Sequence, residues 1–406
     1  MAKVPNPGPA RQLYGHPDGT QRFYAPGRRV FVGTLAGLAA AVSNALPGDE
    51  IVIDWPGTYR LQNTLVVNAP NVTITGNTND ASEIVIRGAG MDEESYGGAP
   101  YGVYSQQPGL SLANLTLRDF YHHAVTFGAG ATDPEFTNVR MLDIGTQFLK
   151  VSAFPAAINN GRMTGCVIGY TANRPVTDHG AGFFYGGGVD VHNSTGWLIS
   201  QCEFLELLPD ADEVAATEGQ PRHMWSPAVY FWNRSADNIV ERCVFKNCGR
   251  IVAFGLMQRG GGEYDNQRGI IRNNMAVVDA GRVAPSQIAN SDGMILAWDS
   301  PGTKILHNTL ITNGQIADAI QGRWSFGLQI SNNLSNDTIR MREDAAYTGA
   351  NNVLTAQASW FMDSASVNLR LSATGVSAVG TANRLADCMD DFDGASRAIL
   401  TRPGAA

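Results

Sequence analysis

The chain has 406 residues, of which 44% are apolar and 16% charged, so it can fill a core and carries too little charge for a disordered or coiled-coil protein. Its 45 glycines favour many tight turns between short strands over a bundle of helices. The net charge of −8 argues against non-specific binding to nucleic acid, which needs a basic face.

The N-terminal part of the chain shows neither a secretory core nor a membrane span. Met1, Ala2 and Lys3 are followed by prolines, and the longest apolar candidate, Leu35 to Leu46, is shorter than the eighteen or so residues of a span. We expect an extracellular or periplasmic protein whose leader has been removed and replaced by a start Met. The alternative is a cytoplasmic protein.

The middle of the chain repeats a phrase of two short alternating strands joined by a turn. The phrase occurs at 188–202, 228–243 and 293–308, and more loosely at 251–274. Strands this short cannot bury an apolar face alone, so successive units must stack on one another. The repeat therefore predicts an all-β solenoid with a continuous core.

One position of the repeat carries cysteine in three units and asparagine in the next three. These residues are Cys166, Cys202, Cys243, Asn274, Asn308 and Asn333. Stacked Asn amides hydrogen-bond from coil to coil, and small thiols can pack in the same column. The cysteines are odd in number, and no pair has zinc-ligand spacing with a histidine. We predict a buried ladder in which the three cysteines stay reduced.

This pattern resembles the right-handed parallel β-helix of the pectin-lyase-like superfamily over residues 50–340. The run from Asp49 to Gly76 is similar to the usual opening of such helices. The resemblance implies that Thr34 to Ala45 forms a helix that caps the first coil, which would otherwise expose its core and a strand edge. The expected division is 1–48 for an N-terminal extension with the capping helix, 49–340 for the β-helix and 341–406 for an irregular C-terminal cap.

Alternation along the first strands selects the side chains that face outward. Val189 and Val191 are apolar and point inward, so Asp190 and His192 face outward. Neighbouring coils place Lys150 on one side of Asp190 and Tyr230 on the other. Because adjacent strands lie about 4.8 Å apart, this row spans about 10 Å.

Four long insertions interrupt the coils, at 168–187, 205–227, 258–267 and 276–292. Long connections in a solenoid are more often functional than accidental. Exposed aromatic side chains are natural platforms for sugar rings, although packing beneath the loops is the alternative for each of them. The residues predicted to bind substrate are Tyr185, His223, Trp225, Trp232 and His123.

The row and the resemblance together predict a polysaccharide lyase that acts on an acidic, uronate-containing chain. Lys150 is similar to the lysine of lyases that cleave alginate and dermatan, but Asp190 and His192 follow where those lyases have Arg and His. Asp190 would hold Lys150 protonated and make it a poor base. We therefore expect Lys150 and Arg250 to neutralise the substrate carboxylate. His192 or Tyr230 would then be the base and the acid.

Two other functions stay open. A glycoside hydrolase needs two carboxylates around one bond, and Asp190 is a candidate for the first. Candidates for the second are Asp178, Asp292 and Glu206. A non-catalytic carbohydrate-binding or surface-structural protein needs only aromatic platforms and a groove, and Lys150 with Asp190 would then be a surface ion pair.

The sequence contains no cofactor motif and no metal motif. Acidic loop residues such as Asp210 and Asp212 could hold Ca²⁺, but their spacing does not identify a site. His307 lies beside the ladder and away from the outward row, so we regard it as structural. The expected partner is a polysaccharide, with no nucleic acid and no membrane, and the expected state is a monomer.

Overall fold

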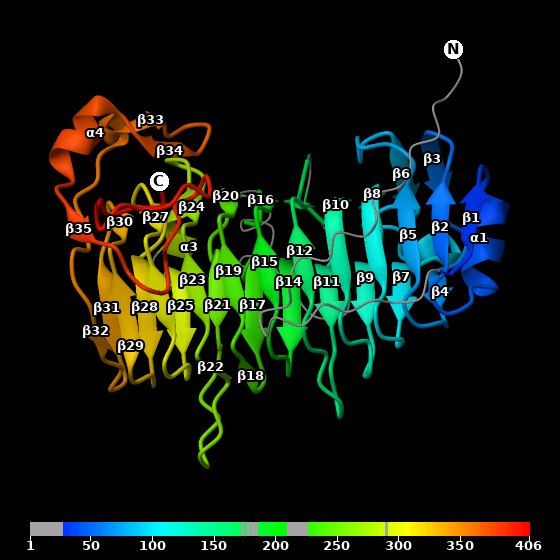
Figure 1. Cartoon of the computed structure of the whole chain (residues 1–406), viewed down its shortest axis with the longest axis horizontal. Helices are drawn as coiled ribbons and strands as arrows, with labels where there is room; N and C mark the ends of the chain where they lie inside the picture. Colours follow the sequence, from blue (N-terminus) through cyan, green and yellow to red (C-terminus); the bar gives the residue numbers. More distant parts are fainter. Residues whose placement is uncertain (1–26, 172–173, 176–178, 180–185, 209–225, 289–290) are drawn as a thin grey trace.

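The computed structural model describes residues 27–171, 174–175, 179, 186–208, 226–288 and 291–406. In this part, the chain winds into a right-handed parallel β-helix whose coils follow one another along the long axis of the molecule (Figure 1). Neighbouring coils pair through parallel strands, and one apolar core runs through the stack from Val32 to Ile330. The predicted fold class is confirmed.

One face of the solenoid is a ten-stranded parallel sheet in which the strand order follows the chain order. Its strands are β4 (Leu65–Val67), β7 (Tyr101–Ser105), β9 (His123–Phe127), β11 (Gln147–Val151), β14 (Gly187–His192), β17 (Val229–Trp232), β21 (Val252–Phe254), β25 (Gly293–Trp298), β28 (Asp318–Arg323) and β31 (Ile339–Arg342). Because the neighbours are parallel and in register, outward side chains of successive coils form straight rows.

The other two faces join in a twenty-stranded sheet, because β8 (Ser111–Arg118) and β10 (Glu135–Leu142) run through both of them. The first face also contains β1 (Arg29–Val32), β2 (Glu50–Ile53), β5 (Thr73–Gly76), β12 (Arg162–Thr164), β15 (Leu198–Ser200), β19 (Ile239–Glu241), β23 (Ile270–Arg272), β26 (Lys304–Leu306), β29 (Leu328–Ser331) and β32 (Tyr347–Thr348). The second contains β3 (Gly57–Arg60), β6 (Ile84–Arg87), β13 (Val167–Gly169), β16 (Glu203–Leu205), β20 (Val244–Lys246), β24 (Met275–Val277), β27 (Thr309–Ile311) and β30 (Leu334–Ser335).

A typical coil therefore has three strands, whereas the repeat predicted two. The missed strand begins just after the ladder position. A tight turn precedes it, and the alternation of apolar and polar residues does not reveal that turn. In five successive coils the residue before the ladder adopts the left-handed conformation, with φ from +52° to +60°, at Gln201, Arg242, Asn273, His307 and Asn332. This conformation lets the chain turn a corner within one or two residues.

The ladder itself is present as predicted. The carbonyl oxygen of each Asn side chain accepts from the amide of the preceding coil, at 2.9 Å from Asn274 to Asn308, and at 3.0 Å from Asn308 to Asn333 and from Asn333 to Asn352. Cys166, Cys202 and Cys243 continue the column and are buried and free, as are Cys248 and Cys388. Burial raises the pKa of the Cys166 and Cys202 thiols, so these two thiols are neutral.

Removing one asparagine side chain of the ladder should destabilise the whole solenoid. Asn308→Ala deletes a side chain that pairs with Asn274 and Asn333 and donates to the carbonyl of Ile271. Each buried group left without a partner costs about 1–3 kcal/mol, so we expect a loss of about 3 kcal/mol or more in the free energy of unfolding. Urea denaturation measures it, with the exposed Asn383→Ala as control. An equal, small loss in both variants would contradict the ladder's structural role.

Helix α1 (Leu35–Ser43) forms in the predicted range and lies at the N-terminal end of the stack (Figure 1). The Thr34 hydroxyl accepts from the backbone N–H of Gly37 and so caps the helix N-terminus. Leu38 and Val42 are its buried residues, and the helix packs against β1, β2 and β4. Its role as a cap for the solenoid, like the division of the chain into three parts, stays a prediction.

The C-terminal segment after β32 folds back along the solenoid (Figure 1). Its helical elements are η2 (Ala358–Trp360) and α4 (Ala373–Ala378), and its strands form two antiparallel pairs, β33 (Phe361–Asp363) with β34 (Asn368–Leu371) and β35 (Ala382–Asn383) with β36 (Leu400–Thr401). Elsewhere, η1 (Tyr96–Gly98), α3 (Pro285–Ile288) and the small pair β18 (Ser235–Ala236) with β22 (Asn266–Gln267) lie in connections.

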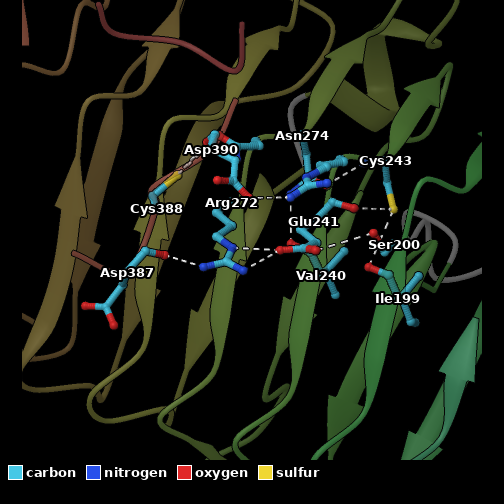
Figure 2. Close-up of polar contacts among 12 residues, drawn as sticks. Ile199, Ser200, Val240, Glu241, Cys243, Arg272, Asn274, Asp387, Cys388 and Asp390 are labelled. Atoms are coloured by element: carbon cyan, nitrogen blue, oxygen red, sulfur yellow. Dashed lines mark hydrogen bonds and ion pairs between the residues drawn. The ribbon is translucent and has the colours of Figure 1, made fainter. Parts of the chain in front are cut away.

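Ion pairs and hydrogen bonds hold this segment on the twenty-stranded sheet. Figure 2 shows Arg272 of β23 between Glu241 of β19 and the backbone carbonyl of Asp387, to which it donates. Buried Arg397 donates to the side-chain oxygen of Asn273 after β23, and Asp390 forms an ion pair with Arg242. His307 is fully buried and also contacts the Gly404 carbonyl, which agrees with the structural role predicted for it. This face is therefore covered, whereas the candidate site lies on the ten-stranded sheet.

Candidate functional site

The predicted row of outward side chains is present in the ten-stranded sheet. Lys150 of β11 pairs in register with Asp190 of β14, and Asp190 pairs with Tyr230 of β17. His192 lies two residues beyond Asp190 and pairs in register with Trp232. The register thus gathers five polar or aromatic side chains on three adjacent strands.

Asp190 is the centre of this cluster. One of its carboxylate oxygens, Oδ2, accepts from the Lys150 ammonium. The other, Oδ1, accepts from the indole N–H of Trp232 at 2.9 Å and lies 3.2 Å from Nε2 of His192. The Asp190 side chain is only 2% exposed, whereas Lys150 and His192 are 15% and 18% exposed. Both oxygens are therefore occupied, and the carboxylate lies beneath its partners.

Burial alone would favour the neutral acid, but the partners of Asp190 reverse its effect. Burial raises the pKa of the Asp190 carboxyl, and the hydrogen bond from His192 and the positive charge of Lys150 outweigh it, so that the pKa falls to about 2. The group is ionised at any pH at which the protein would be expected to work. It can hold cationic or proton-donating neighbours in place, but it has no proton to give.

Lys150 and His192 also contact each other. Nζ of Lys150 lies 3.2 Å from Nε2 of His192, and Nδ1 of the same ring lies 3.4 Å from the amide nitrogen of Asn233. The indole of Trp232 packs on the His192 ring with the centroids 4.5 Å apart. Asp190 and Trp232 thus hold the ammonium and the imidazole side by side.

The predicted role of Tyr230 needs correction. Tyr230 was expected as an exposed acid or base, but it is only 3% exposed, because it packs with Ala253, Leu296 and Trp298 outside the main core. Trp232 donates to Asp190 and packs on His192, and its expected role as a sugar platform stays a prediction. Alternation predicted correctly that both residues lie on the outer surface of the sheet, but it could not predict how their neighbours cover them.

Arg250 does not join the cluster. It forms an ion pair with Asp292, and its register position is two strands from Asp190 and three residues back along the strand, so the two Cα atoms lie about 14 Å apart. The expectation of five converging side chains is therefore wrong for Arg250. The same contact occupies Asp292, one of the carboxylates considered for hydrolysis. Glu206, another, binds Arg174 and Arg282 next to β16.

His123 lies at the start of β9, upstream of the row. Its Nδ1 lies 2.8 Å from the carbonyl oxygen of Gln147, and its ring stacks on Tyr101 with the centroids 5.5 Å apart. Burial lowers the pKa of His123 to about 3, so the ring is neutral near neutral pH. The remaining predicted residues lie outside the described part of the chain. These are Tyr185, His223 and Trp225, together with Asp178 and the calcium candidates Asp210 and Asp212.

Asn233 is a site residue that the sequence reasoning missed. It follows Trp232 in the turn after β17 with φ +57°, and its side chain contacts His192. The left-handed conformation that favours Asn at such turns was a readable signal, but it points equally to a purely structural role.

Among the described residues, no group of three or more His, Cys, Asp or Glu side chains is arranged to hold a metal ion. None of the helices described is long and apolar enough to cross a membrane.

Comparison with known proteins supports the fold. A rhamnogalacturonan lyase superimposes with a TM-score of 0.51 at 12% identity, covering 83% of this chain and 91% of the other. Pectate lyase Pel9A gives 0.45 at 12% identity over 94% and 96% of the two chains, and an alginate lyase from Paenibacillus sp. gives 0.42 at 13% identity over 79% and 99%. No family model and no curated protein matches the chain. The fold is therefore a right-handed parallel β-helix, like that of the rhamnogalacturonan lyase.

Proposed function

We propose that this protein is a carbohydrate-active enzyme that cleaves a uronate-containing polysaccharide by β-elimination at the cluster of Lys150, Asp190 and His192. The observation that carries the proposal is the saturation of Asp190. Its buried carboxylate is fully used in holding two more exposed groups that can accept and donate a proton. Such an arrangement suits a reaction in which the enzyme removes one proton from the substrate and supplies another.

The elimination needs three contributions. A cation beside the uronate carboxylate makes the proton on C5 removable, a base takes that proton, and an acid protonates the leaving oxygen as the C4–O bond breaks and a C4–C5 double bond forms. In this proposal Lys150 supplies the cation and His192 accepts the C5 proton. The Lys150 ammonium gives one of its protons to the leaving oxygen, and the short contact lets the protonated His192 return a proton to Lys150.

The same observation disfavours the glycoside hydrolase. A hydrolase acid must carry a proton at the working pH, and the low pKa of Asp190 leaves it ionised. A nucleophile or base must be within reach of the sugar or of water, and the Asp190 side chain is only 2% exposed, whereas His192 is 18% exposed. Asp292 and Glu206 are themselves paired with arginines.

A polymeric substrate implies where the protein acts. Polysaccharides of this kind lie outside the cytoplasm, so we place the protein in the extracellular space or the periplasm, acting as a monomer on a carbohydrate partner. The rhamnogalacturonan lyase of comparable fold is named for a polysaccharide, and this agrees with the proposed substrate class.

The direct test is incubation with a panel of acidic polysaccharides, following two signals in parallel. Ultraviolet absorbance reports the new double bond, and a colour reaction reports reducing ends. The proposal expects both signals to rise together on at least one uronate polymer. Reducing ends without absorbance would indicate a hydrolase, and binding without either signal would indicate a non-catalytic protein.

A further inference from the structure

A second group of aromatic side chains lies farther along the same face of the solenoid. In the ten-stranded sheet the row of His192 and Trp232 continues, past Gly255, to Trp298 on β25, which pairs in register with Arg323 on β28. Four strand spacings separate His192 from Arg323, or about 19 Å. The two groups thus lie on one line parallel to the solenoid axis.

Arg323 holds this second group together. Its guanidinium lies 4.6 Å from the ring centroid of Trp298 and 4.2 Å from that of Trp324. Two hydrogen bonds to Glu343, of 2.6 and 3.0 Å, fix the guanidinium. Its charge is therefore compensated, and what the group presents is aromatic surface.

Trp324 occupies a position that does not suit a tryptophan. Its φ of +50° is left-handed, which is disfavoured for bulky side chains. The turns after other strands of the sheet carry Asn193, Asn233 and Asp299 at the corresponding point, with φ of +43°, +57° and +47°. Asn and Asp tolerate this conformation. A tryptophan here suggests use of its ring, because strained residues cluster at functional sites.

Two further observations point to a ligand. The Trp298 side chain is more than nine-tenths buried. Its indole N–H is also buried and has no acceptor among the described residues. Two residues beyond Trp324, Phe326 is 58% exposed and meets only the edge of Tyr264 among the described rings. Buried indole N–H groups normally find a partner, and exposed apolar patches commonly mark binding surfaces.

We propose that Trp324, with Arg323, Trp298 and Phe326, forms a distal subsite that stacks a sugar ring of the same polysaccharide chain. Aromatic faces match the apolar faces of pyranose rings, and Trp324 and the exposed Phe326 supply such faces beside Trp298. The chain then runs along the solenoid axis from the Lys150–Asp190–His192 cluster to Trp324. This inference rests on the proposed function only in taking a polysaccharide as ligand.

Trp324→Asn separates binding from structure. Asparagine suits the left-handed turn, so the melting temperature should stay equal or rise, while affinity for a long oligosaccharide should fall roughly three- to tenfold through the lost stacking. Calorimetric titration of oligogalacturonate and oligoalginate into the His192→Ala protein, with and without Trp324→Asn, measures the affinity without turnover. Oligosaccharides too short to span both groups should lose nothing. The control is Trp55→Ala, which removes a 67% exposed tryptophan near the N-terminal end of the solenoid.

Several outcomes would overturn the subsite. Unchanged affinity in Trp324→Asn, an equal loss in Trp55→Ala, or a fall in melting temperature that accounts for the weaker binding would each do so. Failure of the His192→Ala protein to bind either oligosaccharide would also overturn it. If Trp324→Asn weakens binding while the wild type forms no unsaturated product, the lyase proposal fails and the subsite stands.

Discussion

Replacing His192 with alanine is expected to lower turnover about a hundredfold to ten-thousandfold, the usual contribution of one positioned acid or base. The imidazole contacts Lys150 and Asp190 at 3.2 Å each, so its loss removes the proposed base and one carrier of the proton. Substrate affinity should change little, because the Lys150 ammonium stays. Initial rates of double-bond formation over a range of substrate concentrations separate kcat from KM.

The matched control for this experiment is His122→Ala. His122 is another half-buried histidine of the ten-stranded sheet region, but its ring contacts Tyr96 and Tyr121 instead of the cluster. It should keep nearly full turnover. Equal losses in both variants would indicate a general effect on the fold, and full activity of His192→Ala would remove His192 from the mechanism.

The second large effect is expected on stability. Asp190→Ala leaves the Lys150 ammonium without its counter-ion in a largely buried position, and breaking such a pair typically costs about 3–5 kcal/mol. The indole N–H of Trp232 also loses its acceptor. We therefore expect a clear drop in the free energy of unfolding, measured with urea at neutral pH.

A double replacement tests the same pair from the other side. Lys150→Met with Asp190→Leu removes both charges, and replacing a whole buried pair with apolar residues is often neutral for stability. The double variant should therefore regain much of the stability lost in Asp190→Ala and still form no product. Recovery of activity along with stability would show that the pair is structural only.

The pH dependence of stability follows from the same carboxylate. The pKa of Asp190 falls from an ordinary value of 3.8 to about 2 on folding, so its ionised form stabilises the fold by about 2 kcal/mol above pH 4. This contribution is lost as the pH falls from about 4 to 2, because the unfolded chain then takes up a proton that the folded chain does not. The part of the acid-induced loss that comes from Asp190 should be absent from Asp190→Asn.

The solenoid was predictable from the sequence because its determinants are local and repeated. A Cys or Asn at one position of each coil implies a column, and the hydrogen bonds from Asn274 to Asn352 follow from stacking alone. The third strand of each coil escaped the pattern because it follows a turn of only one or two residues. A strand of three residues carries too little alternation to be recognised beside such a turn.

The candidate site was predictable only in part. Period-two alternation and parallel register are enough to align Lys150 with Asp190. The structure shows the two residues in register and in contact. Side-chain burial depends on neighbours from other coils, so the covering of Tyr230 by Trp298 and the pairing of Arg250 with Asp292 had no signal in the local sequence. The proposed distal subsite around Trp324 was missed for the same reason. The left-handed turn that contains Trp324 could not be recognised from the local sequence.

The most direct test of the proposed mechanism is product analysis of Asp190→Asn on the uronate polymer that the wild type cleaves best, recording double bonds and reducing ends together across the pH range. Because Asp190 positions Lys150 and His192 and transfers no proton itself, the variant should retain measurable elimination, with both signals rising in equal amounts and a displaced pH profile. Complete loss of activity, in a protein whose wild type yields reducing ends without double bonds, would contradict the account and identify Asp190 as the catalytic carboxylate of a hydrolase.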